Sequence, residues 1–275
     1  MSVFDEPKID CHCHLLDPDG FPYRPDTPYR PSGQEIGTLA QMEHVFAAYG
    51  VTRALITQPN SGYGEDNSCL LAALAAGGGR YKGMVAVTHD VSLAELARLK
   101  SLGVVGVAFN VPFHGVDYYL GAAALVEKLV ALDMFLQVQV QQDQLLGLWP
   151  LIAASPVRLV FDHTGRPDVA AGVEGAAFQA LLALGRQGRA SIKLSGYLKF
   201  SRQAHPFADT WPFVRALVEG FTLDRCMWGS DWPFLRAAVR MDYGPLLTMV
   251  ETLFPDVTDR QKLFWETPAR LFGFA

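Results

Sequence analysis

The sequence predicts a (β/α)8 barrel. Short runs rich in aliphatic and β-branched residues alternate with helical stretches of about 10 to 15 residues, which is the pattern of βα units around a parallel sheet. Eight such units can be counted, and a closing helix follows the eighth strand. The length of 275 residues and the hydrophobic content of 50% suit one barrel with a buried core. We therefore expect a single domain over residues 1–275.

The predicted strands are short apolar runs bounded by glycine, proline or polar turn residues. In chain order they are 8–15 (KIDCHCHL), 53–58 (RALITQ), 83–88 (GMVAVT), 103–110 (GVVGVAFN), 135–140 (FLQVQV), 158–163 (RLVFDH), 191–195 (SIKLS) and 226–231 (CMWGSD).

The predicted helices lie between these strands and carry Ala and Leu at helical spacing. In order they cover 35–49, 67–76, 93–102, 120–132, 144–153, 178–186, 213–219 and 245–254, and the closing helix covers 258–271. Because a helix follows every strand, including the last, a closed barrel is favoured over an open sheet.

Composition points to small-molecule chemistry. The net charge is -5, and the 23 basic residues are scattered, so the chain lacks the basic patch that nucleic acid or an acidic membrane surface would require. No run of about 18 uncharged apolar residues predicts a membrane span. The first residues are acidic and include a proline, unlike a signal peptide, so we expect a cytoplasmic protein.

The four cysteines are predicted to be buried apolar residues. They are too few and too irregularly spaced for a disulfide framework in a chain of this length. On a strand, Cys11 and Cys13 would both point away from the neighbouring histidines and toward the covering helices.

Four titratable residues are predicted to meet at one mouth of the barrel. Period-two geometry places His12 and His14 on one face of the first strand. His163 ends the sixth strand and Asp231 ends the eighth. Active sites of such barrels lie at the carboxyl ends of the strands, so these four residues form the candidate catalytic group.

Three motifs carry a resemblance to a known family. They are His12-x-His14, the run 162–168 (DHTGRPD) and the run 228–233 (WGSDWP). Together, in this order, they resemble the amidohydrolase superfamily. More narrowly, they resemble its branch of lactone hydrolases that includes 2-pyrone-4,6-dicarboxylate lactonase. The similarity extends over nearly the whole chain.

The resemblance implies hydrolysis of a cyclic ester. In that branch the aspartate on strand eight acts as general base without a divalent metal. By position, Asp231 is then the base that activates water, and His12, His14 and His163 polarise the carbonyl. Trp228 and Trp232, which flank Asp231 in sequence, are apolar neighbours that are expected to raise its pKa toward the useful range.

The expected partner is a small lactone, carboxylated or derived from a sugar. Where the dicarboxylate enzymes hold their substrate with arginines, this chain has Ala108, His114 and Lys199, so a neutral or monoanionic lactone fits better. The sequence leaves open both the source of the lactone, aromatic breakdown or a sugar acid, and the oligomeric state. The predicted substrate-binding residues are Tyr29, Ser61, Tyr63, His114, Gln139, Arg166 and Lys199.

The sequence favours no metal or other cofactor. Many relatives in the superfamily add a ligand from strand five, but this chain has Gln137, Gln139 and Gln141 there. The alternative is one zinc or other divalent ion held by His12, His14 and Asp231, with His163 as a fourth or outer ligand.

Two more side chains have predicted positions. Lys193 has inward parity on strand seven, and a buried lysine needs a partner, for which Asp10 is the obvious carboxylate. Asp162 precedes His163 and is expected to point outward.

Two other functions compete with the lactone hydrolase. One is a zinc-dependent amidohydrolase-type hydrolase or a decarboxylase of unsaturated or aromatic acids, although such decarboxylases normally have a histidine on strand five. The other is an inactive barrel that binds a ligand, which would have little need for so many titratable groups.

Overall fold

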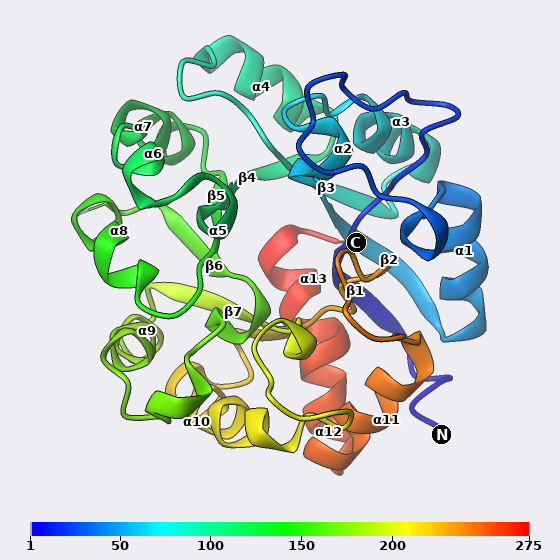
Figure 1. Ribbon diagram of the computed structural model, residues 1–275, viewed down its shortest axis with the longest axis vertical. Helices are drawn as coiled ribbons and strands as arrows, with labels where there is room; N and C mark the ends of the chain where they lie inside the picture. The colour runs from blue at the N-terminus through cyan, green and yellow to red at the C-terminus, as the bar shows by residue number, and fades with distance from the viewer. Residues whose placement is uncertain (1, 154, 275) are drawn as a thin grey trace.

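The computed structural model describes residues 2–153 and 155–274 and has the predicted barrel architecture. Eight parallel strands follow one another in the order β1 to β8, each paired with its neighbour in sequence (Figure 1). They are β1 (Lys8–Cys13), β2 (Val51–Thr57), β3 (Tyr81–Val85), β4 (Val104–Asn110), β5 (Phe135–Gln139), β6 (Arg158–Phe161), β7 (Ala190–Leu194) and β8 (Cys226–Trp228).

Helices surround the strands and cover their outer face (Figure 1). They are α1 (Leu39–Ala48), α2 (Asn60–Tyr63), α3 (Ser68–Gly77), α4 (Leu93–Ser101), α5 (Val111–His114), α6 (Val116–Leu120), α7 (Ala123–Ala131), α8 (Gln144–Ile152), α9 (Ala176–Arg186), α10 (Trp211–Phe221), α11 (Tyr243–Leu253), α12 (Val257–Gln261) and α13 (Thr267–Phe272), with a π-helical segment at Lys262–Glu266 and short 3-10 segments at Gly33–Glu35, His163–Gly165, Val169–Ala171, Tyr197–Lys199 and Ala208–Thr210. In the described ranges, no helix is long and apolar enough to cross a membrane.

The predicted strand ranges are correct at their centres but run two or three residues too far at several carboxyl ends. At β6 and β8, the residues beyond the strand turn away from the sheet with positive φ angles, as at His163 and Asp231. The regular strand geometry ends where the candidate site residues begin, and the alternating pattern in the sequence does not mark that point.

The barrel closes through backbone bonds between β1 and the segment that follows β8. Asp231 N donates to His12 O at 2.7 Å, and His14 N donates to Trp232 O at 2.8 Å. Gly229 permits this close approach, because a Cβ there would lie 2.8 Å from the backbone nitrogen of His12.

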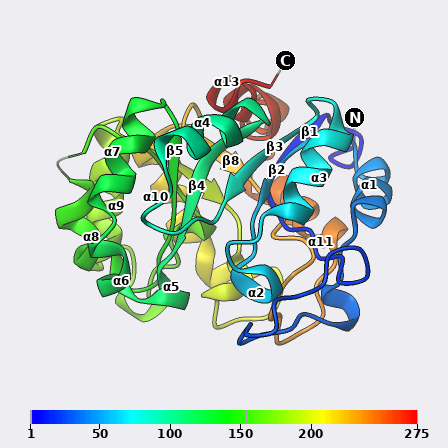
Figure 2. The same ribbon diagram turned by 90° about the horizontal axis from the view of Figure 1, so that it is seen from above.

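The two ends of the barrel are covered differently. At the amino ends of the strands, called the lower end here, the barrel interior is filled by an apolar cluster of strand residues. The aromatic rings of Phe272 and Phe274, at the end of the described chain, cover this cluster. Figure 2 shows α13 at this end of the barrel and α2 and α5 at the other. The carboxyl ends of the strands therefore remain accessible from the side of α2 and α5.

Candidate active site

The first two histidines reach the site because β1 carries a bulge. Between its paired positions Asp10 and Cys13, β1 advances three residues while β2 advances two. The extra residue leaves Cys11 in the inner apolar cluster and His12 on the inner side as well, while Cys13 packs outward against α1. The prediction that both cysteines point outward is therefore wrong for Cys11.

Asp10 directly precedes the bulge and ties β1 to the end of β8. One carboxylate oxygen accepts from the backbone nitrogens of His12 at 3.1 Å and Ser230 at 3.0 Å, and the other accepts from the Tyr243 hydroxyl at 2.8 Å. The predicted pair between Asp10 and Lys193 is wrong, because the bulge turns Asp10 out of the barrel toward α11.

Unusual backbone angles direct the other two catalytic candidates into the mouth. His163 has φ +54° and Asp231 has φ +64°, both in the left-handed region that L-residues rarely adopt. Strand parity places Val160 inside the barrel, so Asp162 also points inward, where it lies 3.2 Å from the His12 ring. The expectation that Asp162 points outward is wrong; His163 would point outward by parity, and its positive φ turns it back.

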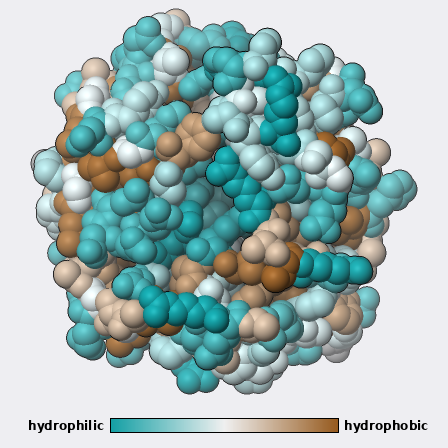
Figure 3. All heavy atoms as spheres, viewed as in Figure 1, coloured by the Kyte–Doolittle hydropathy of each residue, from teal (hydrophilic) through white to brown (hydrophobic). Residues whose placement is uncertain are grey.

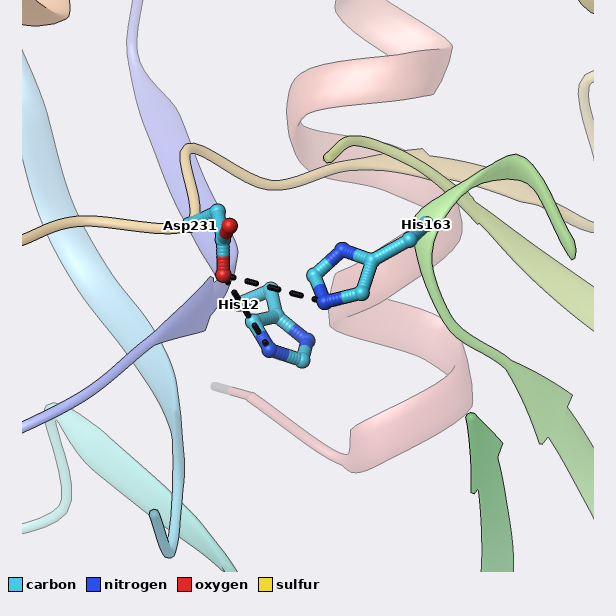
Figure 4. Close-up of side chains that lie close together, drawn as sticks. All are labelled: His12, His163 and Asp231. Atoms are coloured by element: carbon cyan, nitrogen blue, oxygen red, sulfur yellow. Dashed lines mark ion pairs between the residues drawn. The ribbon is translucent and has the colours of Figure 1, made fainter. Parts of the chain in front are cut away.

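The structure brings the four predicted catalytic residues together around one oxygen atom. The Oδ1 atom of Asp231 lies 3.8 Å from His12 Nε2, 3.5 Å from His14 Nε2 and 3.7 Å from His163 Nε2. Figure 4 shows the His163 ring reaching toward Asp231 from across the barrel mouth, while His12 comes from the strand beside Asp231. On the other side of the carboxylate, Lys199 Nζ lies 3.5 Å from Oδ2.

The pKa of Asp231 is shifted in the opposite direction from the expectation. Burial alone would raise it, but the Lys199 ammonium and the His163 ring outweigh burial and hold the pKa of Asp231 well below its usual range. Trp228 and Trp232 belong to the core between strands and helices.

A polar cavity of about 560 Å³ opens above this group. In the space-filling view it is the hollow near the centre of the face, surrounded mostly by hydrophilic residues (Figure 3). His14, His163 and Asp231 contribute to its floor, while His12 lies beneath it. The cavity is rich in side-chain amides and has cations on its rim, with walls that include Gln58, Asn60, Asn110, Gln137, Gln139, Gln141, Arg166, Lys199 and Arg236.

Four of the seven predicted substrate-binding residues line this cavity, namely Ser61, Gln139, Arg166 and Lys199. Tyr63 does not line the cavity; it is buried in the core, and its hydroxyl accepts from Asp17 N at 2.9 Å. His114 lies in an adjacent depression, 3.4 Å from the amide of Asn60.

Tyr29 lies outside the cavity but supports one of its walls. Its hydroxyl donates to Glu35, and the Arg236 guanidinium lies over its ring, 4.3 Å from the centroid. Arg236 lines the cavity and follows β8, so this contact joins the loops after the first and last strands.

Comparison with known proteins identifies the family. Residues 9–274 match the sequence model of a family described as Amidohydrolase. The chain belongs to the amidohydrolase family. It is 36% identical to a 4-sulfomuconolactone hydrolase of Rhizobium radiobacter and 30% identical to a 2-pyrone-4,6-dicarboxylate hydrolase of Comamonas testosteroni, in each case over 96% of this chain and 89% of the relative. The resemblance inferred from the three motifs is confirmed.

A solved structure shows the same architecture. The crystal structure of a putative 2-pyrone-4,6-dicarboxylic acid hydrolase from Pseudomonas putida superposes with a TM-score of 0.85 at 27% identity, covering 100% of this chain and 99% of that chain. The barrel fold is thus shared along the whole chain.

The ligand atoms at the site of this amidohydrolase suit a divalent cation. His12 Nδ1 faces Asp162 Oδ1 at 3.2 Å, and His14 Nδ1 faces the Thr57 carbonyl at 2.8 Å. Both oxygens can only accept, so each ring in its neutral form would carry its hydrogen on Nδ1 and direct its Nε2 lone pair toward the Asp231 carboxylate. In the described part of the chain, the buried His12 Nε2 has no hydrogen-bond partner.

The spacing of these atoms agrees with that conclusion. One ligand atom each from His12, His163 and Asp231 lies within 4.8 Å of the others, and His14 Nε2 lies 3.5 Å from Asp231 Oδ1. Two atoms bound to one zinc ion at tetrahedral angles lie about 3.4 Å apart. The residues therefore fit the alternative, with a metal, that the sequence analysis placed second.

Sequence reasoning missed the residues beneath the histidines. Gln137 Nε2 donates to Asp162 at 2.8 Å, and Ser195 Oγ lies 3.1 Å from His163 Nδ1. Gly196 follows Ser195 with φ +62°, and a Cβ there would lie 2.3 Å from the His163 ring. Glycine at this position is the signal in the sequence that a bulky group packs against the backbone.

Proposed function

We propose that the protein is a hydrolase that opens the ring of a small lactone by adding water to its carbonyl carbon. The observation that carries the proposal is the convergence of three imidazole rings on the Asp231 carboxylate at the floor of a polar cavity. The relatives named as lactone hydrolases, similar along nearly the whole chain, support the same reaction class.

We further propose that His12, His163 and Asp231, with His14 at the rim, hold one divalent ion. When bound, such an ion would supply Lewis acidity, which would make water easier to deprotonate and would polarise the ester carbonyl. This proposal replaces the expectation of a metal-free site, because ligand atoms of His12, His163 and Asp231 lie within 4.8 Å of one another and, among the described residues, the buried His12 Nε2 has no hydrogen-bond partner.

The side chains have distinct roles in the proposed reaction. Asp231 takes the proton of the attacking water and returns it to the ring oxygen as the acyl–oxygen bond breaks. Lys199, beside the carboxylate, places a positive charge where negative charge develops on the carbonyl oxygen. The product is an open-chain hydroxy acid or its keto tautomer.

The cavity supports a monoanionic or neutral lactone as the substrate. Lys199 and Arg166 line its walls and can hold one anionic substituent. Ala108 also lines the wall, at a position where a dicarboxylate enzyme would need a cation, and its methyl group offers none.

A panel of lactones tests this function. Neutral, monoanionic and dicarboxylate lactones are supplied to protein stripped of metal by a chelator and to the same protein after addition of zinc, and proton release is followed. Turnover of a monoanionic or neutral lactone that returns with zinc is expected. Full turnover by the stripped protein would overturn the proposed metal, and release of CO₂ without ring opening would overturn the hydrolase.

A further inference from the structure

A fully buried lysine lies beneath His12, and the proposed chemistry does not use it. Lys193 on β7 has an exposed fraction of 0%. Its Nζ atom lies 2.6 Å from Gln137 Oε1, 3.1 Å from Asp162 Oδ1 and 3.2 Å from His12 Nδ1. A charge buried this deeply is costly unless its partners are fixed.

Two of these neighbours, Gln137 and Asp162, form a closed set of hydrogen bonds with Lys193. The ammonium can only donate, so it holds the Gln137 amide with its oxygen toward Lys193, and the amide nitrogen then donates to Asp162 Oδ2 at 2.8 Å. Both oxygens of Asp162 are thereby fixed, with Oδ1 placed against His12 Nδ1.

This arrangement determines which nitrogen of His12 carries the hydrogen. If Lys193 donated to an unprotonated Nδ1, the ring would carry its hydrogen on Nε2, which has no acceptor within hydrogen-bond distance in the described structure. The lone pair of Nδ1 would also face a lone pair of Asp162 Oδ1, which is unfavourable. With the hydrogen on Nδ1, the ring donates to the carboxylate and leaves the Nε2 lone pair facing Asp231.

We infer that Lys193 is a positioning residue that acts through Asp162 and Gln137 to fix the tautomer of His12, so that Nε2 faces the reaction site as an acceptor. The inference rests on the proposed function in that it explains how the first ligand of the proposed ion is prepared. It concerns the protein before any ion or substrate binds.

The chain provides a matched control for buried charge. Lys8 also has an exposed fraction of 0%, and its ammonium donates to the backbone carbonyls of Glu6 at 2.5 Å and Tyr49 at 2.8 Å. It anchors the chain at the other end of β1 and contacts none of the catalytic candidates. Removing either lysine disturbs a buried cation, but only Lys193 is bonded to the support of His12.

Nuclear magnetic resonance of metal-free protein labelled with ¹⁵N-histidine tests the inference, with the signals of His12 assigned from their loss in His12→Gln. The wild type and Lys8→Met should show one protonated Nδ1 and one unprotonated Nε2. In Lys193→Met the carboxylate is free to rotate, so the two nitrogen signals should move toward each other as both tautomers become populated. Unchanged signals in Lys193→Met would overturn the inference.

Zinc affinity provides a second readout. Removing the support of a ligating histidine typically weakens metal binding by roughly 10- to 100-fold, so Lys193→Met should lose affinity to this extent while Lys8→Met does not. Equal affinities in the two variants would contradict the assignment.

If Lys193→Met does not fold, Gln137→Leu removes the amide that orients both Lys193 and Asp162 and should give the same mixture of tautomers. Unchanged signals there would also overturn the inference. If the wild-type protein has a single His12 tautomer but hydrolyses no lactone, only the proposed function is refuted. If it hydrolyses a lactone fully but has both tautomers, only this inference is refuted.

Discussion

The two ends of the barrel interior are built from opposite kinds of side chain. At the amino end, Ile9, Cys11 and Met227 belong to a dry apolar layer that Phe272 and Phe274 seal. One layer higher, β1, β5, β7 and the residue after β6 supply the buried polar and charged residues His12, Gln137, Lys193 and Asp162. The boundary on β1 falls between residues 11 and 12, at the bulge. The comparison indicates that the lower layer provides stability, while the upper layer sacrifices stability for chemistry.

The largest expected effect lies in the upper layer. Replacing Asp231 by Asn removes the base and one proposed ligand, so lactone turnover should fall by about 10²- to 10⁴-fold. Steady-state kinetics on the best lactone of the panel measures this loss. The control is Asp224→Asn, on the loop before β8, where the side chain is 68% exposed. A loss smaller than tenfold in Asp231→Asn would remove it from the mechanism.

The lower layer should show the opposite result. Met227→Ala leaves a void in the apolar cluster and should lower the free energy of unfolding by about 2 to 5 kcal/mol, with kcat per folded molecule unchanged. Urea denaturation followed by fluorescence measures the loss, and Met227→Leu should cost less than about 1.5 kcal/mol. A marked fall in kcat at full folding would show that the two layers are not separable.

A third variant tests whether the packing of Gly196 against the His163 ring is needed for activity. Gly196→Ala forces the His163 ring aside and should lower kcat/KM by about 10²-fold, the typical effect of a misplaced reacting group. Gly78→Ala is the control, because Gly78 has a similar left-handed backbone with no atom within 4 Å of its added Cβ. Both variants bear the same backbone strain, about 1 to 2 kcal/mol, so equal activity in the two would mean that His163 needs no exact placement.

The smallest effect concerns the pH dependence of stability at the amino end. Burial lowers the pKa of Lys8 from 10.5 to about 8, so between these values the unfolded chain binds more protons than the folded one. Stability contributed by Lys8 should therefore rise with pH across that window. The difference in unfolding free energy between wild type and Lys8→Met, measured at pH 7.5 and 10, isolates this residue. A difference that falls with rising pH would reverse the assigned sign.

Much of this arrangement could be predicted from the sequence. Periodicity located all eight strands, and the rule that barrel sites lie at the carboxyl ends of strands brought His163 and Asp231 to the same mouth as the first histidines. Such predictions succeed where each strand keeps its period of two and its side chains follow the burial pattern.

The errors occur where that period is broken. The bulge reversed the side of Cys11 and Asp10, and nothing in the run KIDCHC marks an inserted residue. The charge pairing of Lys193 depended on which carboxylate shared its layer, which is a property of register between distant strands. The pKa of Asp231 could not be predicted, because it depends on Lys199, a residue whose approach is set by the loop after β7.

The seam between β1 and the segment after β8 has a consequence for how the protein is made. The backbone bonds that join His12 and His14 to residues 231 and 232 are also the bonds that close the cylinder. During synthesis on the ribosome, the three histidines are therefore made well before Asp231. The site should have no activity until the segment after β8 pairs with β1. The appearance of hydrolysis during refolding should accordingly report complete closure, later than any spectroscopic sign of secondary structure.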